Sequence, residues 1–314
     1  MDGHRTVKKG VDKPGRPRSV EPRERAMLHT TLLAKRTRAQ TMGLQEKLKQ
    51  LEQHRKEKEE KEEKDAQKTV TLPMWPASKR ACPSVAFRSA LFPALGRGPR
   101  PMLDDAEIFA VGPVTVRFTG RQLDQETDLT IYLELLHHFN GQQSDHVISI
   151  TAYALLKSLG RTLGSSGYQW LDASFKRLTS GTIEITAETR SQRYRGHLIE
   201  STNENLATGA YKITLNRDFA AMFSKHWSSL DIAQRRNLKT PTAQAFHAYF
   251  SSHYKPGFHR FDTLAAIAGL SDSNPRRLKI RIRGALQQLV EIGFATSIEA
   301  TNDGVAVHVK SVDN

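Results

Sequence analysis

Five basic side chains lie within eight residues near the C-terminal end of the chain, between positions 276 and 283. Arginine can form paired hydrogen bonds with guanine, and both lysine and arginine can contact phosphate, so this cluster is suited to nucleic-acid recognition. Apolar residues recur at helical spacing through the same segment, which predicts an amphipathic helix over Pro275–Ile292. Its candidate DNA-binding residues are Arg276, Arg277, Lys279, Ile280, Arg281, Arg283 and Gln287.

Ile280 is predicted to face outward with Arg276, where an apolar side chain can contact a thymine methyl group. The alternative is a charged face exposed only to water. A short helix predicted at 261–270 and a hairpin predicted at 294–311 favour DNA contact, because such a helix-turn-helix context places the second helix in a major groove.

An earlier segment, 165–178, predicts a second helix of this kind with Leu171, Phe175 and Leu178 buried. Glutamine can pair with adenine, and the arginines in or beside a turn near 190–195 could form a wing that contacts phosphate. A purely structural role is a stronger alternative here, because the helix is less charged. The candidates are Gln169, Ala173, Lys176, Arg177, Arg190, Arg193 and Arg195.

The sequence offers no pattern typical of catalysis or metal binding, so we predict no enzymatic activity, no metal and no cofactor. His137 and His138 are adjacent and would point about 100° apart on a helix. The glycines of 160–167 lack the Gly-Lys-Ser/Thr ending of a phosphate-binding loop, which argues against ATP-driven activity.

The composition predicts a cytoplasmic protein with a polyanionic partner. The 314 residues carry a net charge of +14, and such a charge usually indicates nucleic acid, although a basic surface without a partner remains the alternative. Cys82 is the only cysteine, which fits a reducing compartment. No stretch reaches about 18 apolar residues, so no membrane contact is expected, and the charged N-terminus lacks a secretory signal.

Changes in composition divide the chain into four parts. Residues 1–65 predict a basic, mostly disordered arm with a short charged helix, because they are too polar to bury a core. Residues 66–105 are rich in Pro, Ala and Arg and predict a linker and domain-edge segment. Residues 106–225 and 226–314 predict two folded domains.

The order of predicted elements is similar in the two folded domains. After a hairpin at 107–120, the first has helices at 126–139, 151–159 and 165–178 and strands at 182–188, 194–202 and 209–216. A helix at 217–227 then connects to the second, which has helices at 240–253, 261–270 and 275–292 before its hairpin. We therefore predict an α+β fold: two tandem winged-helix domains, each a helix-turn-helix plus a β-hairpin wing, behind the N-terminal arm.

Four segments resemble the TrfA-type plasmid replication initiators: Met74–Phe92, Phe118–Leu136, Ala248–His253 and Gly269–Ser273. The resemblance implies tandem winged-helix domains that bind directly repeated origin sites (iterons) in double-stranded DNA. It further implies origin melting with the host initiator, recruitment of the host replicative helicase, and a homodimer as the inactive form. The family's sliding-clamp segment corresponds to Gln67–Trp75, where its pattern is degraded, so clamp binding is doubtful.

Two alternatives belong to other functional classes. A winged-helix transcriptional regulator or repressor would use the same fold, so the fold does not decide between them. A coiled-coil interaction protein would depend mainly on residues 40–65.

Overall fold

The computed structural model describes residues 46–47, 49–57, 73–96, 98–140, 147–187, 192–216, 218–219 and 226–309. The chain forms two compact units, Met1–Lys68 and Thr69–Asn314. In the first unit, residues 46–47 and 49–57 are helical and exposed, where a charged helix is predicted. The rest of the predicted arm lies outside the described residues.

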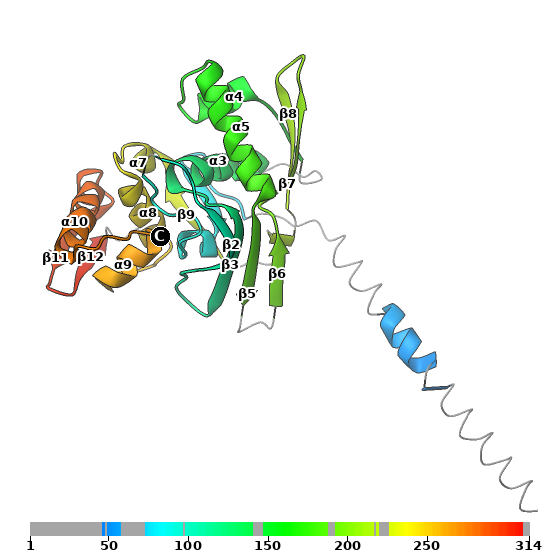
Figure 1. The fold of residues 1–314 in the computed structure, drawn as a ribbon, viewed down its shortest axis with the longest axis horizontal. Helices are drawn as coiled ribbons and strands as arrows, with labels where there is room; N and C mark the ends of the chain where they lie inside the picture. The colour runs from blue at the N-terminus through cyan, green and yellow to red at the C-terminus, as the bar shows by residue number, and fades with distance from the viewer. Residues whose placement is uncertain are drawn as a thin grey trace, which may run out of the picture. The chain divides into compact units, whose positions relative to one another are not determined.

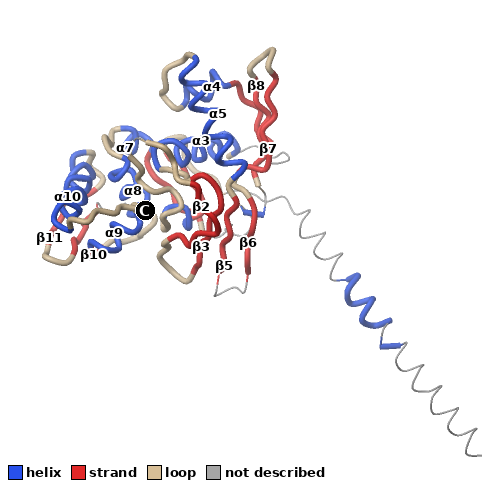
Figure 2. The backbone as a smooth tube through the Cα atoms, in the orientation of Figure 1, coloured by secondary structure: helices blue, strands red, loops and turns tan. Residues whose placement is uncertain are grey.

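The second unit is a mixed α+β structure (Figures 1 and 2). No helix among its described residues is long and apolar enough to cross a bilayer. Its elements, in chain order, are β1 (Lys79–Pro83), α2 (Ser84–Phe87), β2 (Met102–Ile108), β3 (Val114–Arg121), the π-helical turn η1 (Gln125–Leu129), α3 (Thr130–Phe139), β4 (Val147–Thr151), α4 (Ala152–Ser158), α5 (Ser165–Ser180), β5 (Thr182–Ala187), β6 (Gln192–Gly196), β7 (Ile199–Asn205), β8 (Ala210–Leu215), β9 (Trp227–Asp231), α7 (Ile232–Arg236), α8 (Pro241–Ser251), β10 (Gly257–Arg260), α9 (Phe261–Ile267), α10 (Pro275–Glu291), β11 (Ala295–Ala300) and β12 (Gly304–Val309).

One order of elements occurs twice: helix, strand, helix, helix, strand, strand. The first copy runs through α3, β4, α4, α5, β7 and β8, and its antiparallel sheet has the order β4-β8-β7. The second copy runs through α8, β10, α9, α10, β11 and β12, and its sheet has the equivalent order β10-β12-β11. Strands β5 and β6 interrupt the first copy and join β2 and β3 in a four-stranded sheet.

Local sequence explains where the helices of both copies begin. The side chain of Thr151 accepts a hydrogen bond from the Ala154 amide at the start of α4, and Thr240 accepts one from Ala243 at the start of α8. Asn274 accepts hydrogen bonds from the first amides of α10. Such caps satisfy amides that have no partner within the helix. Pro241 and Pro275 occupy first-turn positions, where a missing amide hydrogen costs nothing.

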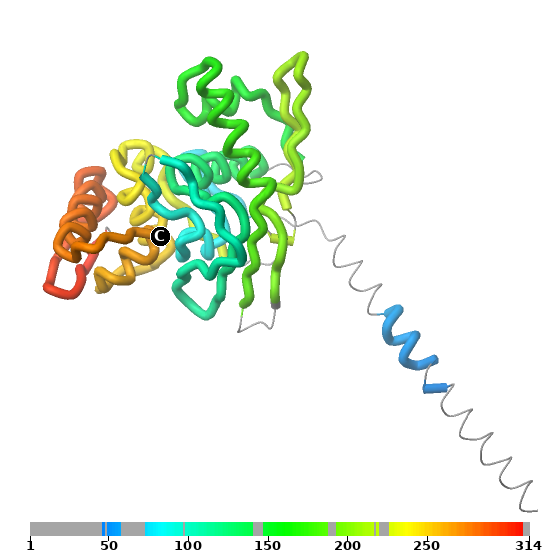
Figure 3. Tube along the Cα trace, viewed as in Figure 1, coloured from blue at the N-terminus to red at the C-terminus, as the bar shows by residue number. Residues whose placement is uncertain are grey.

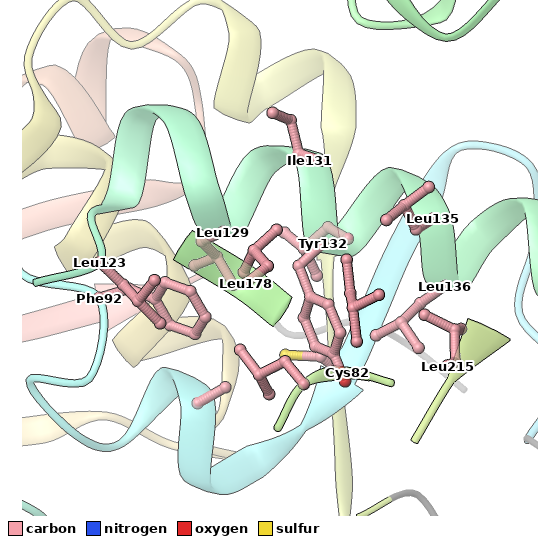
Figure 4. Packing of buried hydrophobic residues seen from close by; sticks show 14 of the residues in the cluster. Cys82, Phe92, Leu123, Leu129, Ile131, Tyr132, Leu135, Leu136, Leu178 and Leu215 are labelled. Atoms are coloured by element: carbon pink, nitrogen blue, oxygen red, sulfur yellow. The ribbon is translucent and has the colours of Figure 1, made fainter. Parts of the chain in front are cut away.

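The buried apolar residues form two clusters, one for each copy of the repeated order. The larger cluster surrounds α3, and in Figure 4 Cys82 lies beside Tyr132 of α3, with Leu136 on the same side of the helix. The smaller cluster lies between α8, α9 and α10. In Figure 3, the yellow-to-red residues of the second copy lie beside the cyan and green residues that precede them.

Within the segment predicted as linker and domain edge, residues 79–94 are ordered and contribute to the core. Strand β1 pairs with β9 along its whole length, and Cys82, Phe87 and Phe92 are at most 1% exposed. A composition rich in Pro, Ala and Arg concealed these few large apolar residues. Because β9 pairs with β1 and Leu230 belongs to the first cluster, the first core also extends past the predicted boundary at 225.

The single strand predicted at 194–202 is two strands in different sheets. Strand β6 pairs with β5, whereas β7 pairs with β8, and His197 and Leu198 lie between them. The Tyr194 hydroxyl donates a hydrogen bond to the carbonyl of His197 at this change of direction. The helix predicted at 217–227 lies mostly outside the described residues, and its last residue, Trp227, begins β9 instead.

Candidate nucleic-acid interface

Helix α10 has the orientation that its sequence pattern predicts. Ile282, Ala285, Leu286 and Leu289 are buried against α8 and α9, with at most 3% of their surfaces exposed. In Figure 1, α10 lies beside the hairpin of β11 and β12. Burial of these four side chains fixes which face of α10 points to solvent, because the other residues are set by the 3.6-residue period.

The outward face of α10 combines positive charge with an apolar side chain. Ile280 is 63% exposed although it is large and apolar. No carboxylate occurs on α10 before Glu291, so the charge of its basic residues is not cancelled within the helix. Of the predicted DNA-binding residues on α10, the exposed ones are Arg276, Arg277, Ile280, Arg281, Arg283 and Gln287.

Two of the predicted residues also support the neighbouring hairpin. The Lys279 ammonium donates a hydrogen bond to the Asn302 carbonyl at 2.7 Å, and Arg283 donates one to the Thr301 carbonyl at 3.2 Å. Both cations lie over the ring of Phe261, 5.4 Å and 5.3 Å from its centre. These side chains therefore connect the helix to the β11–β12 turn, and Phe261 is a supporting residue that the sequence prediction missed.

The basic residues of α10 differ in how far they are already paired. Arg277 has a distant ion pair, with 4.0 Å between its Nε atom and the carboxylate of Asp272. Among the described residues, no acidic partner is found for Arg276 or Arg281. These two arginines therefore carry the least compensated charge on the helix, and they are best placed to meet phosphate or base edges.

Helix α5 presents a nearly neutral face by comparison. Gln169 and Ala173 are exposed, as predicted. Lys176 is also exposed, but its ammonium lies 2.8 Å from the carboxylate of Asp172, one turn earlier. The outward surface of α5 therefore offers hydrogen-bonding groups with little net charge.

Arg177 does not belong to the outward face of α5, which corrects its prediction as a DNA-binding residue. Its guanidinium donates hydrogen bonds of 2.8 Å and 3.1 Å to the buried carboxylate of Asp128 in η1. Ser174 donates to the same carboxylate at 2.6 Å, and Arg100 approaches it at 3.3 Å. Burial raises the pKa of Asp128, and the hydrogen bonds and charge of Arg177 oppose that rise. These contacts attach α5 to the body of the first copy.

Arg193 and Arg195 lie on β6, which pairs with β5 directly after α5 but belongs to the four-stranded sheet and not to the sheet of the repeated order. Their side chains are exposed, and their contact with phosphate stays a prediction. Both pair with Glu184 of β5, at 3.3 Å and 2.5 Å. Across this sheet, Glu107, Arg117, Glu184 and Arg195 form a row of alternating charge. The hairpin of the repeated order is β7–β8 instead. Arg190 lies outside the described residues.

The helix pair α4–α5 also exposes aromatic and basic side chains that are not among the predicted DNA-binding residues. Tyr153 and Tyr168 are 50% and 41% exposed. The Arg161 guanidinium, in the turn between the helices, lies 4.5 Å from the centre of the Trp170 ring. Basic residues next to aromatic ones within a predicted helix-turn-helix are the signal that could have identified this surface.

Among the described residues, no three His, Cys, Asp or Glu side chains are grouped closely enough to hold a metal ion. The outward surfaces of α5 and α10 remain the candidate nucleic-acid-binding surfaces among the described residues.

The chain is similar to several known proteins. The plasmid replication initiator protein TrfA of Escherichia coli is 23% identical over 244 residues, which cover 75% of this chain and 63% of that protein. The crystal structure of domains 2 and 3 of RctB has a TM-score of 0.46 at 10% identity, covering 74% of this chain and 99% of that one. The Pi initiator protein in complex with iteron DNA has a TM-score of 0.44 at 11% identity, covering 59% and 93%.

The chain spans less than two thirds of its E. coli relative. The sequence pattern of the TrfA protein family nevertheless matches residues 35–311, which is most of the chain. The chain therefore belongs to the TrfA protein family.

Proposed function

We propose that this chain is a plasmid replication initiator that binds directly repeated sites in double-stranded origin DNA. The observation that carries the proposal is the outward face of α10, where exposed arginines without acidic partners surround an exposed isoleucine. Arginine provides phosphate contacts and guanine recognition, and isoleucine provides contact with thymine methyl groups. The E. coli relative is named a plasmid replication initiator, which supports the same conclusion.

The two copies of the repeated order are, in this proposal, tandem winged-helix domains. In each copy a helix pair, α4–α5 or α9–α10, is followed by a hairpin, β7–β8 or β11–β12. The second helix of each pair would enter a major groove and the hairpin would lie along the backbone as a wing. Asn302 and Thr301 support this geometry in the second copy, because Lys279 and Arg283 hold that turn beside α10.

The two domains would contribute unequally. Helix α10 supplies most of the affinity, since phosphate contacts by uncompensated cations dominate protein–DNA binding. Helix α5 supplies hydrogen-bonding side chains such as Gln169, which can recognise adenine. Each DNA repeat would then have one half that α10 binds strongly and one half that α5 binds weakly.

Later steps at the origin belong to the same proposal. Bound chains would promote origin melting and recruit the host initiator and replicative helicase, and a homodimer would be the inactive form. Membership of the TrfA family supports these steps. Clamp binding through Gln67–Trp75 is the weakest part, because the sequence pattern is degraded and most of the segment lies outside the described residues.

Replication in trans tests the function. A plasmid that carries only the candidate origin should replicate when this chain is supplied from a second plasmid, and footprints on each repeat should cover about two turns of DNA, about 20 base pairs. Failure to replicate, together with intact repression of a promoter that carries the same repeats, would indicate a transcriptional regulator. A footprint of one turn would contradict reading by two domains.

Gly284 allows a test of how closely DNA approaches α10. It lies inside the helix on the exposed face, and a Cβ atom added there would meet nothing within 4 Å. Gly284→Ala should therefore raise the free energy of unfolding by about 0.5–1 kcal/mol. The same methyl group should weaken DNA binding if a groove surface packs against this face. Urea denaturation and fluorescence anisotropy measure the two effects. Unchanged affinity would mean that DNA does not come into contact with α10 at this residue.

A further inference from the structure

A short segment, Leu91–Ala94, passes from one apolar cluster to the other. Phe92 is fully buried in the first cluster, and Ala94, two residues later, is 3% exposed in the second. The segment thus leaves one copy of the repeated order and enters the other within three residues. We call Leu91–Ala94 the clasp.

The clasp backbone forms a hydrogen bond with each copy. The carbonyl of Pro93 accepts from the amide of Gln125, at the start of η1, at 3.1 Å. The amide of Ala94 donates to the carbonyl of Ala268, at the end of α9, at 2.8 Å. Two consecutive residues therefore join η1, the turn immediately before α3 of the first copy, to the helix pair of the second copy.

Gly269 packs against the clasp so closely that no side chain fits. A Cβ atom at this position would lie 2.4 Å from the Cβ atom of Pro93, and the backbone φ of Gly269 is +60°. Gly293, at the end of α10, has a similar φ of +72°, yet a Cβ atom there would meet nothing within 4 Å. The restriction at Gly269 therefore comes both from its turn and from contact with Pro93.

A buried arginine makes a second connection beside the clasp. Arg235 of α7 donates hydrogen bonds to the Gln125 carbonyl at 2.6 Å and to the Gln244 carbonyl of α8 at 3.2 Å. Burial lowers the pKa of Arg235 to about 10. The amide of Gln125 therefore donates to Pro93, and its carbonyl accepts from Arg235.

These contacts connect the two outward-facing helices through short steps. Helix α5 is attached through Arg177 to Asp128 in η1, and η1 is attached through Gln125 to Pro93. On the other side, Ala94 and Pro93 contact Ala268 and Gly269, immediately before the turn that leads to α10. Each step is a hydrogen bond or a close packing contact; Asp128, Gln125, Pro93, Ala94 and Ala268 are buried, whereas Arg177 is partly buried and Gly269 is exposed.

We propose that the clasp fixes the orientation of α5 relative to α10, so that the two helices form one rigid reader of DNA. The fixed orientation of α5 relative to α10 does not depend on the proposed function. The preference for one spacing between DNA half-sites does rest on the proposed function. A rigid reader binds two half-sites with high affinity only at the spacing that its geometry matches, because a preorganised second contact avoids an ordering cost.

Distances between spin labels test the coupling without DNA. Labels on Ser180→Cys at the end of α5 and Glu291→Cys at the end of α10 occupy exposed positions, and the buried Cys82 does not compete for the reagent. The chain with both labels should give one narrow distance distribution. Gly269→Ala and Pro93→Gly should each broaden or shift it, since one introduces a clash and the other removes the ring without introducing one. Gly293→Ala is the matched control and should leave the distribution unchanged.

Binding to DNA tests the consequence, with unlabelled chains. Gly269→Ala should lower affinity for two correctly spaced half-sites by about tenfold or more, while affinity for an isolated half-site stays as in the parent chain. Circular dichroism verifies that both variants fold. A label distribution in Gly269→Ala and Pro93→Gly as narrow as in the parent chain, at the same distance, would overturn the clasp. If both variants broaden the label distance distribution as expected but the parent chain does not bind the repeats, the coupling by the clasp is supported and the proposed function is rejected.

Discussion

Replacing both Arg276 and Arg281 with alanine is expected to reduce affinity for a cognate DNA site by at least about 30-fold, since each arginine at such an interface contributes about 1–3 kcal/mol. Both side chains are exposed on α10, and no acidic partner is found for either among the described residues. Their charge is therefore available for phosphate and base contacts. The salt dependence should also become shallower, by about 0.9 in log–log slope for each phosphate that the double variant no longer neutralises.

A matched control separates this effect from a general loss of charge. Arg117→Ala also removes one arginine, but the charge of Arg117 is already compensated by Asp105, 2.7 Å away. Arg117→Ala should leave affinity and salt slope close to those of the parent chain. Fluorescence anisotropy with cognate and scrambled duplexes at several salt concentrations measures all variants. Parent-like affinity in the double variant would place the DNA contact away from α10.

Replacing Asp128 with alanine is expected to lower the free energy of unfolding by about 3–5 kcal/mol, the usual cost of removing one partner from a buried ion pair. The carboxylate is fully buried and accepts hydrogen bonds from Arg177 and Ser174. Without it, the guanidinium of Arg177 would remain partly buried next to an apolar side chain, and α5 would lose its attachment to η1. Urea denaturation followed by circular dichroism gives the change.

Asp172 provides the control for this prediction, because it is also an acidic residue in an ion pair of α5. Its carboxylate lies 2.8 Å from Lys176, but both side chains are mostly exposed, at 52% and 76%. Asp172→Ala should change the free energy of unfolding by less than about 0.5 kcal/mol, as expected for an exposed pair one turn apart. Equal effects of the two substitutions would mean that Asp128 does not hold α5 in place.

The contrast between α10 and α5 explains why one prediction concerns binding and the other stability. On α10, the arginines at 276 and 281 extend into solvent and can meet a ligand. On α5, Arg177 turns inward, and its guanidinium is paired with the carboxylate of Asp128. The same residue type is therefore exposed and proposed for recognition on α10, whereas on α5 it forms a contact that holds the first copy together.

The sequence by itself determined most helices of the two copies and the buried face of α10. The apolar period of α10 identified its buried stripe, and the helices predicted at 240–253 and 275–292 agree with α8 and α10. These features are local, because a helix face is set by residues three and four positions apart. For the same reason, the recurrence of helices followed by a hairpin was visible without any knowledge of their packing.

Only the tertiary structure decided which charges remain free and which segments belong to the core. Arg177 meets Asp128, 49 residues away in sequence, and β1 pairs with β9 across more than 140 residues, so neither contact leaves a local pattern. Strands β6 and β7 looked like one strand because the change from one sheet to another depends on distant partners. Local periodicity thus predicts which face of a helix or strand a side chain occupies. Which residue packs against that face depends on contacts between segments that are far apart in the sequence.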